Sequence, residues 1–350
     1  MADSSPDDIS AQAELKTGQK RAGAERSNAR QRASLACVPC RSKHVKHPVS
    51  LYYANFHVAH SWLPPRGILQ TCYDAKPDDL RFLMAVVSYI GSLYSESGGN
   101  PTLRQQAYSM FNKELPPTIW SVQALLSLSV AAFGQLDDYG PIFERACQLA
   151  LNIQLQHKRT ADGYKDPVLA ESCRRTYWGL YIHRSLLAIP ANQLHSLLFP
   201  VVTSSGTELP CEEWEYETGN IPVSVSLEEY NLSDPSRDFS SWAYFIDIIR
   251  IRDRSVAPSL QGLGKAELFL NTANQQIDSW RLRLKNWKRD RVDDDGMVDT
   301  ILYHALGVSF SQPEKIWRVL AHVEGSLGKD APKAMGFGEA EDTSAFYGSD

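Results

Sequence analysis

The chain has 350 residues, 43% of them hydrophobic and 22% charged, with a formal net charge of −5. This composition allows a sizeable buried core, and six cysteines in so long a chain are too few for a disulfide framework. We find no signal sequence and no apolar run near the ~18 residues of a membrane helix, so we expect a soluble protein of a reducing, intracellular compartment.

Charge is distributed unevenly along the first 47 residues. Residues 1–15 carry four acids and no base, whereas residues 16–47 carry nine Lys or Arg against Glu25 alone, a local charge of +8. Residues 1–35 have almost no branched or aromatic side chains, so we expect a disordered tail there. A basic segment on an acidic body is typical of an arm that binds a polyanion or directs nuclear import, and the Lys20–Arg21 pair could belong to an import patch.

The stretch ACVPCRSKHVKH combines a C-x2-C pair, Cys37 and Cys40, with a basic run. Thiolates at this spacing can hold zinc, and the basic residues beside them would face an anion such as nucleic-acid phosphate. A structural zinc needs four ligands, yet the next cysteine is Cys72. One alternative is a single zinc held by the two thiolates together with His44 and His47.

Helical patterning begins after this stretch. Leu51–Gln70 predicts a short amphipathic helix that runs into an extended turn at Pro64–Pro65. Apolar residues at three- and four-residue steps predict four more helices, with Asp78 or Asp79 capping the first and Thr118 the third. These helices span Asp78–Tyr94, Thr102–Lys113, Thr118–Gly134 and Tyr139–His157. The last two, joined by a short turn, should pack as an antiparallel pair.

The second half of the chain continues the helical pattern. Asp166 and Pro167 suit the N-cap and first position of a helix that runs to about Ile189 and is apolar enough to be the centre of a bundle. A loop is expected over Val201–Pro222. Further helices are expected over Phe239–Val256, Leu268–Trp287 and Val298–Val308, before an irregular or disordered tail. Strand signals are scarce throughout, so we predict an all-α fold.

Three groups of side chains could carry chemistry, and each also has a structural interpretation. His57 and His60 could be metal ligands or two side chains on a partly buried aromatic helix. Arg174 and Arg175 could bind an anion or pair with carboxylates of the same fold. Four acidic residues could form a metal or acid–base cluster or a solvated loop: Glu212, Glu213, Glu215 and Glu217. No hydrolase, phosphate-loop, metalloprotease or dinucleotide motif is present, which predicts a protein that is not an enzyme.

Five segments, in order, resemble the fungal binuclear zinc-cluster transcription factors. They are ACVPCRSKHVK, LYYANFHVAHSWLPP, IWSVQALLSLSVAAFGQ, RRTYWGLYI and LPCEEWEYETGNIP. In this family six cysteines bind two zinc ions, the basic loop after the second cysteine lies against DNA, and an all-α middle homology region follows. The resemblance covers approximately residues 36–310.

The resemblance implies roles for particular residues. The implied zinc ligands are Cys37, Cys40 and His47, the last standing at the third cysteine position, and the implied DNA-facing residues are Arg41, Lys43, His44 and Lys46. It also implies a nuclear protein whose partners are promoter DNA and a second copy or a related regulator. The expected domains are a tail at 1–35, a partial zinc cluster at 36–47, a helical regulatory domain at 48–310 and a second tail at 311–350.

The chain also departs from the family. The second half of the cysteine motif and the usual linker and coiled coil are missing, and Arg184–Ser185 stands where the family usually has Asp-Arg. Two thiolates and one imidazole cannot hold two zinc ions. Three hypotheses follow. The protein, in its intact form, binds promoters of RNA polymerase II; or it is a truncated interaction protein built on the helical domain; or a coding segment after Lys46 has been lost.

Overall fold

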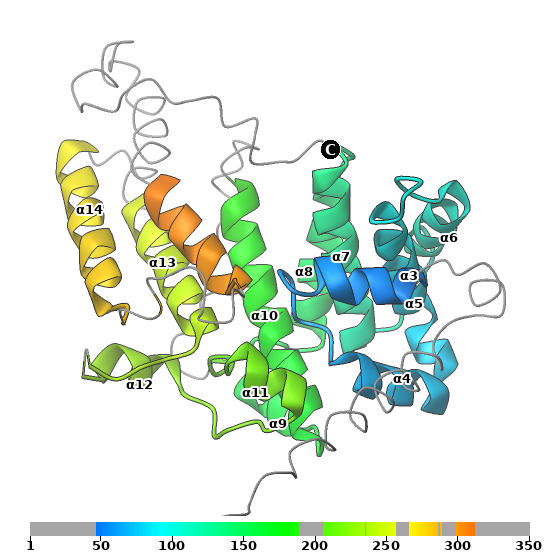
Figure 1. The fold of residues 1–350 in the computed structure, drawn as a ribbon, viewed down its shortest axis with the longest axis horizontal. Coiled ribbons are helices and arrows are strands. Elements are labelled where there is room, and N and C mark those ends of the chain that lie inside the picture. Colours follow the sequence, from blue (N-terminus) through cyan, green and yellow to red (C-terminus); the bar gives the residue numbers. More distant parts are fainter. Residues whose placement is uncertain are drawn as a thin grey trace, which may run out of the picture.

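The computed structural model describes residues 47–188, 206–234, 236–256, 266–285, 288 and 298–311. These residues are helical apart from turns, loops and two isolated β-bridges, His157–Gly206 and Leu209–Val225, so the all-α prediction is confirmed (Figure 1). In this part of the chain, every helix is too short or too polar to cross a bilayer. The predicted tails lie outside the described residues.

The N-terminal part of the body differs from the prediction for Leu51–Gln70. Three short elements replace the single helix and turn: α3 (Pro48–Leu51), the π-helix η1 (Tyr52–Phe56) and α4 (Arg66–Ala75). The next predicted helix, Asp78–Tyr94, is observed as α5 (Pro77–Leu93). Pro64 and Pro65 separate η1 from α4, because proline cannot continue a helix but can precede one. The N-cap of α5 is Lys76, so the predicted caps Asp78 and Asp79 instead lie in its first turn. Their negative charges stabilise the helix there, because the N-terminal end of the helix dipole is positive.

The middle of the chain follows the predicted order. It contains α6 (Pro101–Phe111), α7 (Ile119–Gly134), α8 (Gly140–Asn152), α9 (Lys158–Asp162) and α10 (Pro167–Ala188). The Thr118 hydroxyl accepts a hydrogen bond from the Ser121 N–H at 3.3 Å, and the Asp166 carboxylate accepts one from the Val168 N–H at 2.8 Å, which confirms both caps. The helix predicted to reach His157 ends five residues earlier, before a left-handed residue at Gln154.

The C-terminal part adds α11 (Glu213–Thr218), α12 (Leu227–Leu232), α13 (Ser241–Val256), α14 (Ala266–Arg283) and a helix over 300–311. Because α11 lies inside Val201–Pro222, the expectation of a simple loop there is wrong. α10 lies at the centre of the described helices and contacts α7, α8, α9 and α13, as predicted (Figure 1). One contiguous hydrophobic core runs from Val49 to Val308, so the first and last described helices share it.

Candidate functional site

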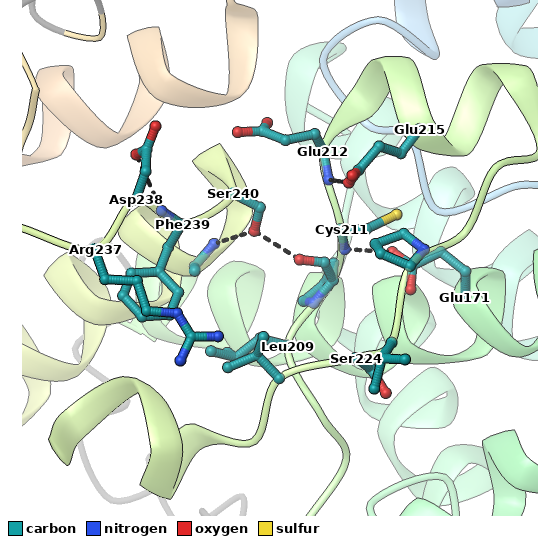
Figure 2. A pocket seen from close by; sticks show the side chains of 15 residues that line it. Glu171, Leu209, Cys211, Glu212, Glu215, Ser224, Arg237, Asp238, Phe239 and Ser240 are labelled. Atoms are coloured by element: carbon teal, nitrogen blue, oxygen red, sulfur yellow. Dashed lines mark hydrogen bonds between the residues drawn. The ribbon is translucent and has the colours of Figure 1, made fainter. Parts of the chain in front are cut away.

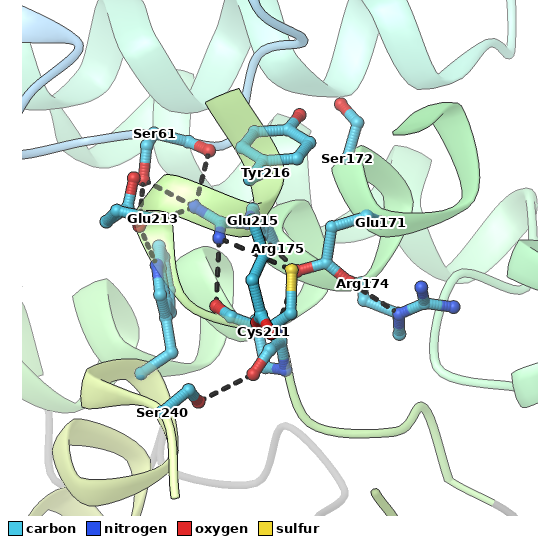
Figure 3. Close-up of polar contacts among 12 residues, drawn as sticks. Ser61, Glu171, Ser172, Arg174, Arg175, Cys211, Glu213, Glu215, Tyr216 and Ser240 are labelled. Carbon is cyan, nitrogen blue, oxygen red and sulfur yellow. Dashed lines mark hydrogen bonds and ion pairs between the residues drawn. The ribbon is translucent and has the colours of Figure 1, made fainter. Parts of the chain in front are cut away.

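Arg175, in the middle of α10, is fully buried and joins three separate parts of the chain (Figure 3). Its Nε donates to Glu171 Oε1 at 2.9 Å, and its Nη1 donates to Ser61 Oγ at 2.9 Å and to Glu213 Oε1 at 2.5 Å. Its Nη2 donates to the Cys211 carbonyl at 2.9 Å. We call the group of residues around this guanidinium the Arg175 junction.

Two aromatic rings enclose the junction. The guanidinium carbon of Arg175 lies 4.0 Å from the ring centre of Tyr216 and 5.6 Å from that of Trp242. Trp242 also donates from its indole N–H to Glu213 at 2.7 Å, and Ser61 donates to the same carboxylate oxygen at 2.8 Å. These contacts cover the guanidinium and hold α11 and α13 against α10, while Glu213 stays partly exposed.

Glu171 is the buried counter-ion of the junction. Its two carboxylate oxygens accept hydrogen bonds from Arg175, from Arg174 Nε at 2.8 Å and from the Cys211 N–H at 2.9 Å. Burial alone would raise the pKa of this carboxyl, but Arg175 and Arg174 outweigh that effect and lower the pKa below its usual value. The structural interpretation of the two arginines is therefore confirmed, because both pair with a carboxylate of the same fold.

A second polar cluster lies beside the junction, around Trp62. The side-chain amide of Gln123 in α7 lies 3.0 Å from the Trp62 carbonyl, 2.8 Å from Ser172 Oγ and 2.9 Å from Thr176 Oγ1. The Trp62 indole N–H donates to Ser127 Oγ at 2.9 Å. The segment that follows η1 is thereby fixed to both α7 and α10.

The acidic residues of α11 do not form a solvated loop, so that expectation is wrong. Glu212 accepts from the ammonium group of Lys288 at 2.6 Å, and it forms a reciprocal capping box with Glu215. Burial raises the pKa of Glu212 although Lys288 opposes this shift. At the end of the same helix, Glu217 lies 3.0 Å from Nε2 of His57. Each of these acids has a structural partner.

The histidines of the body also have structural surroundings. His57 is buried beside Glu217, and His60 lies among aromatic rings, 5.1 Å from Trp62 and 5.5 Å from His183 between ring centres. Burial lowers the pKa of His60 well below its ordinary value and that of His183 to about 4. No set of three or more His, Cys, Asp or Glu in the described part of the chain is arranged to hold a metal ion. The interpretation of His57 and His60 as side chains of a partly buried aromatic segment is confirmed, with His57 buried and His60 half-buried.

Most of the predicted zinc and DNA residues lie outside the described residues: Cys37, Cys40, Arg41, Lys43, His44 and Lys46. His47 is described, and its Nδ1 accepts the Val49 N–H at 3.3 Å, which caps α3. Burial, followed by the charge of Arg66, lowers the pKa of His47, so its ring is neutral at physiological pH.

Sequence reasoning missed four residues that hold the junction and its surroundings together: Ser61, Gln123, Trp242 and Lys288. Ser61 and Gln123 stand in segments that resemble the family, and Trp242 and Lys288 stand outside them, but no local pattern marks any of the four as a partner in these contacts. The clearest sequence signal is that of Gln123, a polar residue in the apolar helix α7.

Comparison with known proteins gives one informative relative. The chain is 29% identical over 297 residues to the C6 finger domain transcription factor iacK of Pestalotiopsis fici, an alignment that covers 81% of this chain and 43% of that protein. The chain thus spans less than half the length of the curated relative it matches. No protein-family model matches the chain, and no solved structure matches it. The similarity supports a relationship with the fungal zinc-cluster family.

Proposed function

We propose that the protein is a transcription regulator of the fungal zinc-cluster type, without enzymatic activity, that acts in the nucleus. Residues 48–310 would form its helical regulatory domain. Basic residues of 36–47 would contact the promoter DNA of genes transcribed by RNA polymerase II. The observation that carries this proposal is the similarity to a C6 finger domain transcription factor over 81% of the chain.

The arrangement of the four motif segments after residue 48 adds support. Ser61, Gln123, Arg175 and Glu213 come from four different segments of the family pattern, and they meet in the Arg175 junction and the adjoining Trp62 cluster. Segments that were recognised separately in the sequence therefore share one buried polar core. This is expected when they are parts of a single regulatory domain.

Zinc is the cofactor implied by the resemblance, and His47 does not fit it in the observed conformation. A neutral imidazole whose Nδ1 accepts a hydrogen bond carries its proton on Nε2, so the ring has no free lone pair for a metal. Coordination by His47 would replace the cap of α3. Cys37 and Cys40 remain as thiolate ligands, and a zinc ion would need further ligands beside them before it could order the basic residues that follow.

DNA binding can be tested by fluorescence anisotropy with the full chain and promoter fragments at 50 mM salt. We expect binding that weakens as salt is added. In a plot of the logarithm of the binding constant against the logarithm of the salt concentration, each phosphate contact makes the slope steeper by about 0.9. Replacing Arg41, Lys43 and Lys46 together by Ala should lower that steepness by about 2.7. A matched control replaces three exposed bases of the body, Lys76, Arg81 and Lys113, and should leave it unchanged. Absence of binding to every fragment at low salt would contradict the proposal.

A second candidate function is an interaction protein that no longer binds DNA. The observation that favours it is His47, which caps α3 and leaves two thiolates, too few for a structural zinc. Zinc measured on the purified chain separates the two functions. Two ions per chain would contradict the second candidate, whereas a metal-free chain would favour it.

A further inference from the structure

A pocket of about 280 Å³ lies directly beside the Arg175 junction (Figure 2). Its walls come from residues 209–212, 222–225 and 237–240, together with Glu171 of α10, Glu215 of α11 and Ala243 of α13. Apolar side chains form much of the surface: Leu209, Pro210, Pro222, Val223, Val225, Phe239 and Ala243. If each non-hydrogen atom with its hydrogens occupies about 30 Å³, the volume of a water molecule in the liquid, the pocket has room for a ligand of about ten non-hydrogen atoms.

The walls of this pocket are fixed by hydrogen bonds. Ser240 Oγ donates to the Pro210 carbonyl at 2.6 Å and accepts from the Ala243 N–H at 3.1 Å. The Leu209 N–H donates to the Val225 carbonyl at 2.8 Å, and the Cys211 N–H donates to Glu171. The pocket is therefore pre-formed, so a ligand would bind without first ordering the loops.

Most of the charges around the pocket are neutralised by partners within the fold. Glu171 pairs with Arg174 and Arg175, and Glu212 pairs with Lys288. The one basic lining residue, Arg237, pairs with Glu229 at 2.8 Å. These pairs cancel one another and add no net charge to the pocket.

Two lining carboxylates remain without a cation. Asp238, just before α13, accepts hydrogen bonds from the Phe239 N–H at 3.0 Å and from the Tyr244 hydroxyl at 3.3 Å. Glu215, in α11, accepts one from the Glu212 N–H at 2.9 Å. In the part of the chain that the structure describes, neither forms an ion pair. The pocket therefore combines an apolar surface with two negative charges from different walls.

We propose that this pocket is a binding site for a small organic amine, a protonated ammonium group on an apolar body. The ammonium group would pair with Asp238, and Glu215 on the opposite side of the pocket would add negative charge without touching it (Figure 2). The apolar body would lie on Leu209, Val225 and Phe239. A carboxylate ligand of the same size would face two uncompensated negative charges. The proposal concerns ligand binding alone, so it stands or falls independently of DNA binding.

The test uses the full chain and three probes of matched size: 2-phenylethylamine, phenylacetate and 2-phenylethanol. Ligand-observed NMR titration should show binding of the amine that is clearly stronger than that of the alcohol, with the acid weakest. Raising the salt concentration from 50 to 500 mM should weaken binding of the amine, because salt screens the attraction to the carboxylates. Equal binding of all three probes, a salt-independent affinity, or no binding of the amine at 10 mM would each overturn the proposal.

A matched pair of variants places the binding in this pocket. Asp238→Asn keeps the shape and the hydrogen-bond acceptor but removes the charge, and it should weaken amine binding about three- to fivefold. Asp234→Asn makes the same change at an exposed residue outside the pocket and should have no effect. Equal affinities of the two variants would overturn the proposal. The salt titration of the unmodified chain provides the test if Asp238→Asn does not fold.

Discussion

Arg175 has no exposed surface, so its positive charge is stable only because the fold surrounds it with acceptors. Glu171 and Glu213 supply negative charge, and carbonyl and hydroxyl oxygens from Cys211 and Ser61 accept the remaining N–H groups. Removal of this one side chain would leave Glu213 without its cation and Glu171 with Arg174 alone. The residue therefore stabilises the contact among α10, α11 and the segment after η1, and no donor remains for an external anion.

Replacement of this arginine should destabilise the fold strongly. Arg175→Met fills a similar volume but leaves the buried Glu171 short of a counter-ion, and we expect a loss of about 3–5 kcal/mol in the free energy of unfolding. As a control, Arg237→Met removes the exposed ion pair with Glu229 and should change the free energy of unfolding by about 0–1 kcal/mol. Urea denaturation of the two variants measures both values. Equal losses would show that the junction does not contribute as described.

The half-buried rings of His60 and His183 predict an acid-sensitive fold. Burial lowers the pKa of His183 to about 4 and that of His60 well below 6.5, so both rings are neutral in the folded chain at pH 6. The unfolded chain takes up protons at these positions below pH 6.5. Stability is therefore fully present above pH 6.5 and falls toward lower pH, by up to about 1.4 kcal/mol per pH unit for each histidine.

Urea midpoints measured between pH 6.5 and 5 check this dependence, because the carboxylates remain largely ionised there in the unfolded chain. His183→Asn keeps a side-chain N–H but cannot titrate, so its stability should fall less steeply with pH than that of the unmodified chain. Identical slopes would contradict a neutral, half-buried His183.

Among the elements, α3 depends on close contact with α5. A β-carbon at Gly91 would lie 1.9 Å from the carbonyl oxygen of Pro48, so only glycine allows the two backbones to approach this far. Gly91→Ala should therefore displace α3, with a loss of about 1–3 kcal/mol and faster proteolysis near residues 47–56. Gly67→Ala, in α4, meets no atom within 4 Å and should leave the stability unchanged or raise it by up to about 1 kcal/mol. Urea denaturation and limited proteolysis provide the comparison.

The long helices were predictable because their signals are local. Thr118 and Asp166 satisfy N–H groups two or three residues away, and the apolar repeat of α5 follows its buried face. α4 is amphipathic, but Pro64–Pro65 just before it favoured an extended turn over the start of a new helix. α11 has six residues and depends on the capping box between Glu212 and Glu215, whose three-residue spacing was the signal that could have identified it.

The Arg175 junction was predictable only in part, because only one of its contacts joins residues that are close in the sequence. Arg175 and Glu171 are four residues apart on one helix, a spacing at which opposite charges pair. The other partners of this arginine are far away in the chain, with Ser61 separated by 114 residues and Glu213 by 38. Their meeting depends on how the helices pack, which no local pattern encodes.

At the scale of the whole molecule, the last described helix closes the fold onto its first segment. Thr300 donates a hydrogen bond to the Val58 carbonyl, and Ser241 donates to Asp299 at 2.5 Å. Lys288 links Ser241 to Glu212 and so connects this closure with the Arg175 junction. Helix 300–311 is therefore an integral part of the regulatory domain that we propose, which agrees with a boundary near residue 310.

Truncation tests that boundary. Removal of residues 299–350 would expose the surface that Ile301, Leu302 and Leu306 now cover, and the loss of three buried side chains at about 1.5–3 kcal/mol each approaches the whole stability of a typical domain. We expect this variant to unfold or to melt without cooperativity. Removal of residues 312–350 keeps the described helix over 300–311 and should leave the melting temperature unchanged.

Removal of residues 1–46 should likewise leave the melting temperature unchanged, because His47 retains the cap of α3 and the core begins at Val49. Circular dichroism during heating compares the three truncated chains with the intact one. If the chain that ends at residue 298 melted like the intact chain, helix 300–311 would be an appendage and the domain would end before it. If the chain that begins at residue 47 melted at a lower temperature, the basic arm would itself contact the body, and the division at residue 48 would be wrong.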